Sequence, residues 1–186
     1  MLNNILNCYH LAKEDEKTKG KLWYLEARNI CKRIAKETNT PFIVACGVMA
    51  ALSPQNYWEQ NIKDCKAYIL DSNYNPATYK IFKRKAEDII TMDNPTVKKV
   101  CNVLNGQKIT RFFLNIYSRR YNVVTIDRHA IAIYHGTKDH NFKYTPKRVA
   151  KIREEYKKAA KIVGIKPYQL QAITWVTWKR INKEVL

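Results

Sequence analysis

The feature that most constrains the fold of this chain is an unbroken apolar run from Phe42 to Leu52. Its eleven residues are far fewer than the roughly 20 that a membrane-spanning helix needs. The run also has no polar face, so a helix built from it must be covered on every side by other parts of the chain. The sequence therefore predicts a central buried helix surrounded by other elements.

Apolar residues recur at helical spacing in the segments around that run. The sets are Trp23, Ala27, Ile30, Cys31 and Ile34; Trp58, Ile62, Cys65 and Ile69; Ile109, Phe112, Phe113, Ile116 and Tyr117; and Val149, Ile152, Tyr156, Ala159 and Val163. Residues 122–126 alone are strand-like, and a five-residue strand without a partner makes a sheet improbable. For 186 residues, this pattern predicts an all-α single domain of about eight or nine helices.

Prolines indicate where several of these helices begin, because Pro suits the first helical position and Asn or Thr suits the residue before it. Four such pairs occur, at Thr40-Pro41, Asn75-Pro76, Asn94-Pro95 and Thr145-Pro146. Gly164 is expected to end the helix that starts at Pro146, and a further helix is expected from Tyr168 to Ile181.

Charge indicates the class of partner. The chain has 34 Lys and Arg against 16 Asp and Glu, a formal net charge of +18, which favours nucleic acid or an anionic membrane surface. With 46% hydrophobic residues it can still form a folded core.

The five cysteines include no C-x-x-C pair, so they indicate neither a disulfide framework nor a zinc or iron–sulfur site. The N-terminus lacks a secretory signal pattern, so we expect an intracellular protein.

Three segments carry chemistry. In the first, residues 50–58, the buried helix ends in a polar turn that contains Gln55 and Asn56. In the second, Asn105 and Gly106 form a predicted hairpin between helices, whose exposed backbone N–H groups suit a phosphate oxygen. In the third, Asp127 lies between an apolar run and the next helix.

Together these segments resemble the helix-hairpin-helix DNA glycosylase superfamily of endonuclease III and the 8-oxoguanine glycosylases. The similarity rests on Leu-Ser-x-Gln at 52–55, a Gly-x-Lys hairpin at 106–108 and an apolar-Asp-x-His turn at 126–129, and it covers about residues 42–135. Lys108 and Asp127 are nineteen positions apart, close to the family's spacing. Phage-type proteins with Leu-Ser-Pro-Gln-x-x-Trp and Ile-Asp-Arg-His-Ala are more similar still. The resemblance implies a two-lobed helical fold.

It also implies roles for single residues. Asp127 would stabilise the positive charge that develops on the sugar as an N-glycosidic bond breaks. Lys108 would be the amine that forms a Schiff base and permits strand cleavage. Gln55, or less favourably Asn56, would fill the hole that an extruded base leaves, and Asn105, Gly106 and Gln107 would anchor phosphate. The sequence departs from the family in having one hairpin glycine and in lacking the C-terminal four-cysteine cluster, so no iron–sulfur cluster and no other cofactor is expected.

Each role has a simpler alternative. Lys108 could be a solvated lysine, Asp127 could only cap a helix, and Gln55 could only satisfy backbone groups of the turn. Arg128 and His129 are expected to contact phosphates or to hold the turn. A metal role is not indicated, because His129, His135 and His140 lack ligand spacing. Trp175 and Trp178 fit a core better than a base-stacking surface.

The sequence thus predicts a monomeric DNA glycosylase, with or without lyase activity, that binds double-stranded DNA and no membrane. Two alternatives stay open. One is a catalytically inactive DNA-binding protein on the same scaffold. The other is a related enzyme that acts on phage-type modified bases or on RNA.

Overall fold

A computed structural model of the chain describes residues 1–138 and 142–183; His140 lies outside the described residues. These residues form ten helices and no strand. The helices are α1 (Leu2–His10), α2 (Glu14–Glu37), α3 (Phe42–Leu52), α4 (Trp58–Leu70), α5 (Lys80–Ile90), α6 (Val97–Leu104), α7 (Gln107–Tyr117), α8 (Arg128–His135), α9 (Pro146–Ile162) and α10 (Pro167–Ile181). The all-α prediction is confirmed, with a helix number slightly above the predicted one.

The chain divides into two compact units. The terminal unit comprises residues 1–24 and 120–186, and the middle unit comprises residues 25–119. Helix α2 begins in the terminal unit and ends in the middle unit. None of the helices in the described residues is long and apolar enough to cross a membrane.

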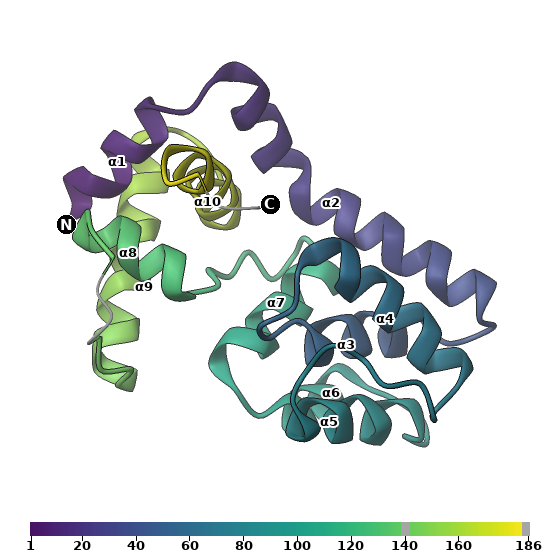
Figure 1. The fold of residues 1–186 in the computed structure, drawn as a ribbon. Coiled ribbons are helices and arrows are strands. Elements are labelled where there is room, and N and C mark those ends of the chain that lie inside the picture. Colours follow the sequence, from purple (N-terminus) through teal and green to yellow (C-terminus); the bar gives the residue numbers. More distant parts are fainter. Residues whose placement is uncertain (139–141, 184–186) are drawn as a thin grey trace. The chain divides into compact units, whose positions relative to one another are not determined.

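Helix α3 is the centre of the middle unit. All its residues from Val44 to Leu52 are buried, and α4, α5, α6 and α7 pack around it (Figure 1). Arg28 of α2 adds a hydrogen bond to the carbonyl oxygen of Ile116 at 3.3 Å. The central buried helix that the apolar run predicts is therefore confirmed.

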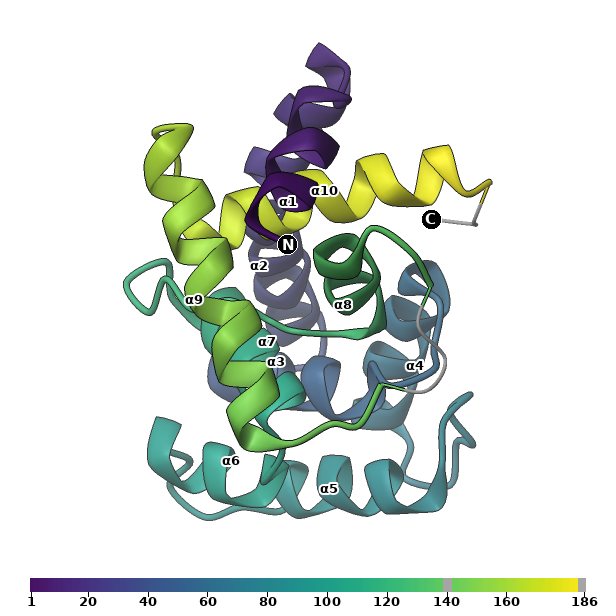
Figure 2. The same cartoon turned by 90° about the vertical axis from the view of Figure 1, so that its left-hand side faces the viewer.

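The terminal unit is built from the first part of α2 and from α1, α8, α9 and α10. Helix α1 contacts α8, α9 and α10 (Figure 2), and its Ile5 and Cys8 enter a core with Tyr156 and Leu170. The strand-like residues 122–126 lie beside this core without forming a strand. Val124 and Ile126 are buried there, and Thr125 between them is buried as well.

The proline signals are correct at one site and displaced at others. Pro146 begins α9, and the Thr145 side chain accepts a hydrogen bond from the Arg148 N–H as expected. Helices α3 and α6 begin one and two residues after Pro41 and Pro95. The start predicted at Pro76 is wrong, because α5 begins at Lys80. The Ala77 N–H donates instead to the Asp64 carboxylate, which holds this segment in a loop.

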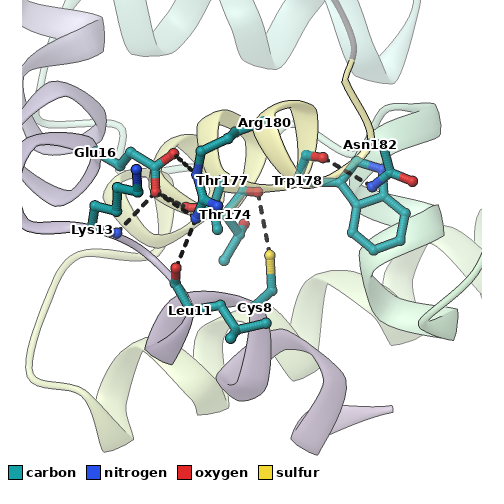
Figure 3. A network of polar contacts seen from close by, with 9 residues as sticks. All are labelled: Cys8, Leu11, Lys13, Glu16, Thr174, Thr177, Trp178, Arg180 and Asn182. Atoms are coloured by element: carbon teal, nitrogen blue, oxygen red, sulfur yellow. Dashed lines mark hydrogen bonds and ion pairs between the residues drawn. The ribbon is translucent and has the colours of Figure 1, made fainter.

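The carboxylate of Glu16 joins the start of α2 to the end of α10 in the terminal unit. Glu16, only 5% exposed, accepts hydrogen bonds from Arg180 Nε at 2.6 Å and from the Lys13 N–H at 2.9 Å (Figure 3). Arg180 also donates to the Leu11 carbonyl at 2.9 Å. Burial alone would raise the pKa of Glu16, but the hydrogen bonds from Arg180 and Lys13 outweigh it and lower the pKa. Glu16 is therefore held as a carboxylate between α2 and α10.

We expect Glu16→Gln to lower the melting temperature at pH 7, because it removes the charge that Arg180 binds, at a cost of about 1–3 kcal/mol. A lowered pKa in the folded state stabilises above the unfolded pKa and stops stabilising as pH falls through the folded one. The difference between the two proteins should therefore shrink below about pH 4. Thermal unfolding at pH 7 and pH 3 measures this difference.

Glu14→Gln, in an exposed ion pair with Lys17, is the control, and its melting temperature should differ little from that of the wild type. Equal melting temperatures for wild type and Glu16→Gln at pH 7 would contradict the prediction.

Gly20 marks a close approach of α2 and α10. A Cβ added there would lie 2.5 Å from the backbone Cα of Ile173, whereas at Gly47 it would lie 2.9 Å from a side-chain atom, the Cγ2 methyl of Ile89. Gly→Ala within a helix normally stabilises by about 1 kcal/mol. Gly20→Ala should instead destabilise by about 2 kcal/mol, because backbone must move, and Gly47→Ala should cost less. Urea unfolding of both variants tests this order; a Gly20→Ala protein as stable as wild type would disprove the close approach.

Candidate nucleic-acid interface

A short hairpin joins α6 to α7 in the middle unit. Asn105 takes the left-handed conformation, with φ 39° and ψ 44°, and ends α6. Gly106 is extended and precedes α7 without a side-chain cap. Room exists for a Cβ at Gly106, whose nearest contact would be 3.5 Å away. The residue that makes the turn possible is therefore Asn105, and the first turn of α7, which includes Gln107, supplies backbone donors of the kind that bind phosphate.

Two lysines lie near this hairpin in different surroundings. Lys108 is exposed on the first turn of α7. Lys85 of α5 is half-buried and donates to the carbonyl oxygen of Leu104, the last residue of α6. Burial lowers the pKa of Lys85. Lys85 therefore serves as a cation at the C-terminus of α6.

Asp127 begins α8 in the terminal unit. Its Oδ1 accepts a hydrogen bond from the Ala130 N–H at 2.8 Å, as in a helix N-cap. Within the described residues no hydrogen bond uses its Oδ2. The side chain as a whole is half-buried. The capping role predicted for Asp127 is confirmed, and the cap uses one of its two carboxylate oxygens.

Arg128 and His129 follow in the first turn of α8 and differ in exposure. Arg128 is exposed and donates from Nε to His129 Nε2 at 3.4 Å. His129 is buried, with its ring edge-on to Trp175 at 6.3 Å between centroids. Lys179 lies over the same Trp175 ring, with Nζ 4.5 Å from its centroid. Of the two roles expected for this pair, phosphate contact fits Arg128 and holding the turn fits His129.

Gln55 lies at the exposed turn after α3. Its backbone is left-handed, with φ 58°, and its Oε1 accepts a hydrogen bond from the Tyr79 hydroxyl at 2.7 Å. Tyr79 is itself 56% exposed. The nearby Thr78 hydroxyl donates to the Pro54 carbonyl at 3.3 Å. A polar side chain and an aromatic ring are thus held together at the surface, and we call them the Gln55–Tyr79 pair.

Asn56 turns inward to Asp64, which is fully buried on α4. Asp64 Oδ2 accepts from Asn56 Nδ2 at 2.8 Å and from the Ala77 N–H at 2.9 Å. Its Oδ1 accepts from Gln60 Nε2 at 2.7 Å and from the Tyr74 hydroxyl at 2.8 Å. Burial alone would raise the pKa of Asp64, but these four hydrogen bonds outweigh it and lower the pKa. We call these five residues the Asp64 network.

The predicted site residues therefore fall in both units. Gln55, Asn56 and the hairpin residues 105–108 belong to the middle unit, and residues 127–129 to the terminal unit. Each unit is basic by itself, with 15 Lys and Arg against 8 Asp and Glu in the middle unit and 19 against 8 in the terminal unit. No group of His, Cys, Asp and Glu suited to a metal ion occurs among the residues described.

Sequence reasoning missed Asp64, Tyr79 and Lys85. The donors to Asp64 come partly from Tyr74 and Ala77, ten and thirteen positions further on, so helical spacing gave no sign of them. Tyr79 directly precedes α5, whose first residues are rich in lysine and arginine. An aromatic residue next to a basic helix was the feature of the sequence that could have indicated a nucleic-acid contact there.

A family model matches residues 1–182 of the chain. The chain belongs to the DUF7178 family, which is described as a family of unknown function. Searches of curated proteins and of solved structures found no match to this DUF7178 chain. Its function must therefore be argued from its own residues.

Asn105 provides a test of the hairpin. A left-handed residue favours Gly or Asn over other residues by about 1 kcal/mol, so Asn105→Gly should keep stability and Asn105→Ala should lose about that amount. If the hairpin anchors phosphate, Asn105→Ala should also weaken duplex binding more than Asn105→Gly does. Melting temperature and fluorescence anisotropy measure the two effects. Equal behaviour of the two variants in both assays would contradict a left-handed Asn105.

Proposed function

We propose that this protein is a DNA glycosylase that extrudes a modified or mispaired base from duplex DNA and cleaves its N-glycosidic bond. The observation that carries the proposal is the Asp127 carboxylate, which caps α8 with one oxygen and leaves the other unbound within the described residues. The cap fixes the carboxylate in place before any substrate arrives. A fixed negative charge of this kind stabilises a sugar that becomes positive in the transition state.

The remaining predicted residues supply binding. The positive charge of both units supports affinity for the phosphate backbone, which carries no information about sequence. The hairpin at Asn105 and Gly106 adds backbone donors at the start of α7. The exposed Gln55–Tyr79 pair suits the space that opens when a base leaves the stack. Arg128 is an exposed cation beside the proposed carboxylate.

Asp127 can act without a covalent step, by orienting or deprotonating water that attacks the anomeric carbon as the base departs. A lyase reaction would need an amine in addition. Lys108 is the exposed candidate, and Lys85 is a second amine whose pKa burial lowers. The Lys85 nitrogen is engaged by the Leu104 carbonyl, so we assign the lyase role to Lys108.

Asp127→Asn tests the catalytic role sharply, because an asparagine Oδ1 can keep the hydrogen bond from the Ala130 N–H while the charge is lost. We expect base release to fall by about 10²-fold or more, with duplex affinity and melting temperature nearly unchanged. Base release is measured on a panel of duplexes with damaged or modified bases. A wild-type protein that binds these duplexes but releases no base from any of them would favour a non-catalytic DNA-binding protein.

Lys108 is tested by trapping with borohydride, which reduces a Schiff base to a stable covalent adduct. Lys108→Ala and Lys108→Arg should both lose the adduct, whereas Lys108→Arg should keep the phosphate affinity that depends on charge. Lys85→Ala is the control and should keep the adduct. An adduct that persists in Lys108→Arg and disappears in Lys85→Ala would transfer the lyase role to Lys85.

A further inference from the structure

The Asp64 network joins two loops that both carry exposed side chains. Asn56 comes from the turn after α3, whereas Tyr74 and Ala77 come from the segment between α4 and α5. The first loop carries Gln55 and the second carries Tyr79. Asp64 itself is 0% exposed, so it cannot touch a macromolecular ligand. Its effect on the surface must pass through the loops that it binds.

The bonds of Asp64 show how specific this connection is. All four partners are neutral donors, and they occupy both carboxylate oxygens in pairs. A buried carboxylate is costly unless such bonds satisfy it. Asparagine cannot replace it, because an amide would present N–H groups to donors and lose about half of the bonds.

The exposed residues depend on this arrangement for their geometry. Gln55 has a left-handed backbone, which a non-glycine residue adopts only when its surroundings require it. The next residue, Asn56, donates to Asp64 at 2.8 Å. The side chain of Gln55 itself accepts from the Tyr79 hydroxyl at 2.7 Å. Tyr79 in turn lies two residues after Ala77, whose N–H is also bound to Asp64. Both members of the Gln55–Tyr79 pair are therefore positioned through one carboxylate.

We infer that Asp64 is a positioning residue that holds the Gln55–Tyr79 pair in the conformation needed to occupy a duplex site from which a base is missing. The inference rests on the proposed function, because it assigns the ligand of this surface as a base-sized gap in duplex DNA. Asp64 affects the preference for a duplex with an abasic site over an intact duplex, whereas the lysines and arginines determine the overall affinity for DNA.

The experiment uses the full chain and two labelled duplexes of the same sequence, one intact and one with a single tetrahydrofuran abasic site. Anisotropy at fixed salt gives the ratio of the two dissociation constants. We expect the wild type to favour the abasic duplex by about tenfold, and Asp64→Asn to bring that ratio close to one while intact-duplex affinity stays within about twofold. Asp71→Asn makes the same chemical change at an exposed aspartate that caps the end of α4, and it should keep the wild-type ratio.

A double-mutant comparison separates positioning from general destabilisation. Gln55→Ala should also lower the ratio, and Asp64→Asn should add nothing further in that background, because both changes remove the same contact. Tyr74→Phe removes a single bond to Asp64 and should lower the ratio partly, so it decides the question if Asp64→Asn fails to fold. Melting temperatures show which variants are folded.

The outcomes discriminate between the two proposals. If Gln55→Ala lowers the ratio but folded Asp64→Asn and Tyr74→Phe do not, Asp64 has no positioning role while the proposed function stands. If the wild type releases a base but shows no preference for the abasic duplex, this inference is wrong and the glycosylase proposal survives. If Asp127→Asn changes nothing while the ratios behave as expected, the gap-binding surface is supported and the glycosylase proposal fails.

Discussion

The burial of α3 is the constraint on which the middle unit depends. A helix that is apolar on all sides gains its stability from complete removal from water, at roughly 25 cal/mol for each Å² of apolar surface. Four helices surround it, and two of them, α6 and α7, are the arms of the hairpin. The next residues after α3 are the turn that carries Gln55 and Asn56. The candidate DNA-contacting segments are thus attached directly to the most deeply buried helix of the unit.

Much of the fold could be predicted from sequence because it depends on local patterns. Thr145 and Asp127 cap helices as their residue types predict, and the apolar run of α3 is buried as its lack of a polar face requires. The error at Pro76 has a tertiary cause. The first N–H groups of a helix have no acceptor within the helix. The Ala77 N–H would be one of them, but here it donates to the buried Asp64 carboxylate, thirteen residues earlier, and the segment stays a loop.

The candidate site was predicted less completely, for a related reason. Gln55, Lys108 and Asp127 could be proposed from the sequence because each stands in a short motif. Asp64 was missed because three of its four donors lie in loops outside α4, and Lys85 because its acceptor is at the end of α6. Residue type alone suggests that a lysine or aspartate is solvated, and the contacts that reverse this expectation in a folded chain are not local.

The neutral surroundings of Asp64 have a consequence for ionic conditions. Mobile ions screen attractions between exposed charges over about 10 Å at 0.1 M salt, so phosphate contacts by lysine and arginine weaken as salt rises. The bonds that hold Asp64 join a buried anion to uncharged donors and lie beyond the reach of such screening. As salt concentration rises, affinity for DNA should therefore fall well before the loops that carry Gln55 and Tyr79 change conformation.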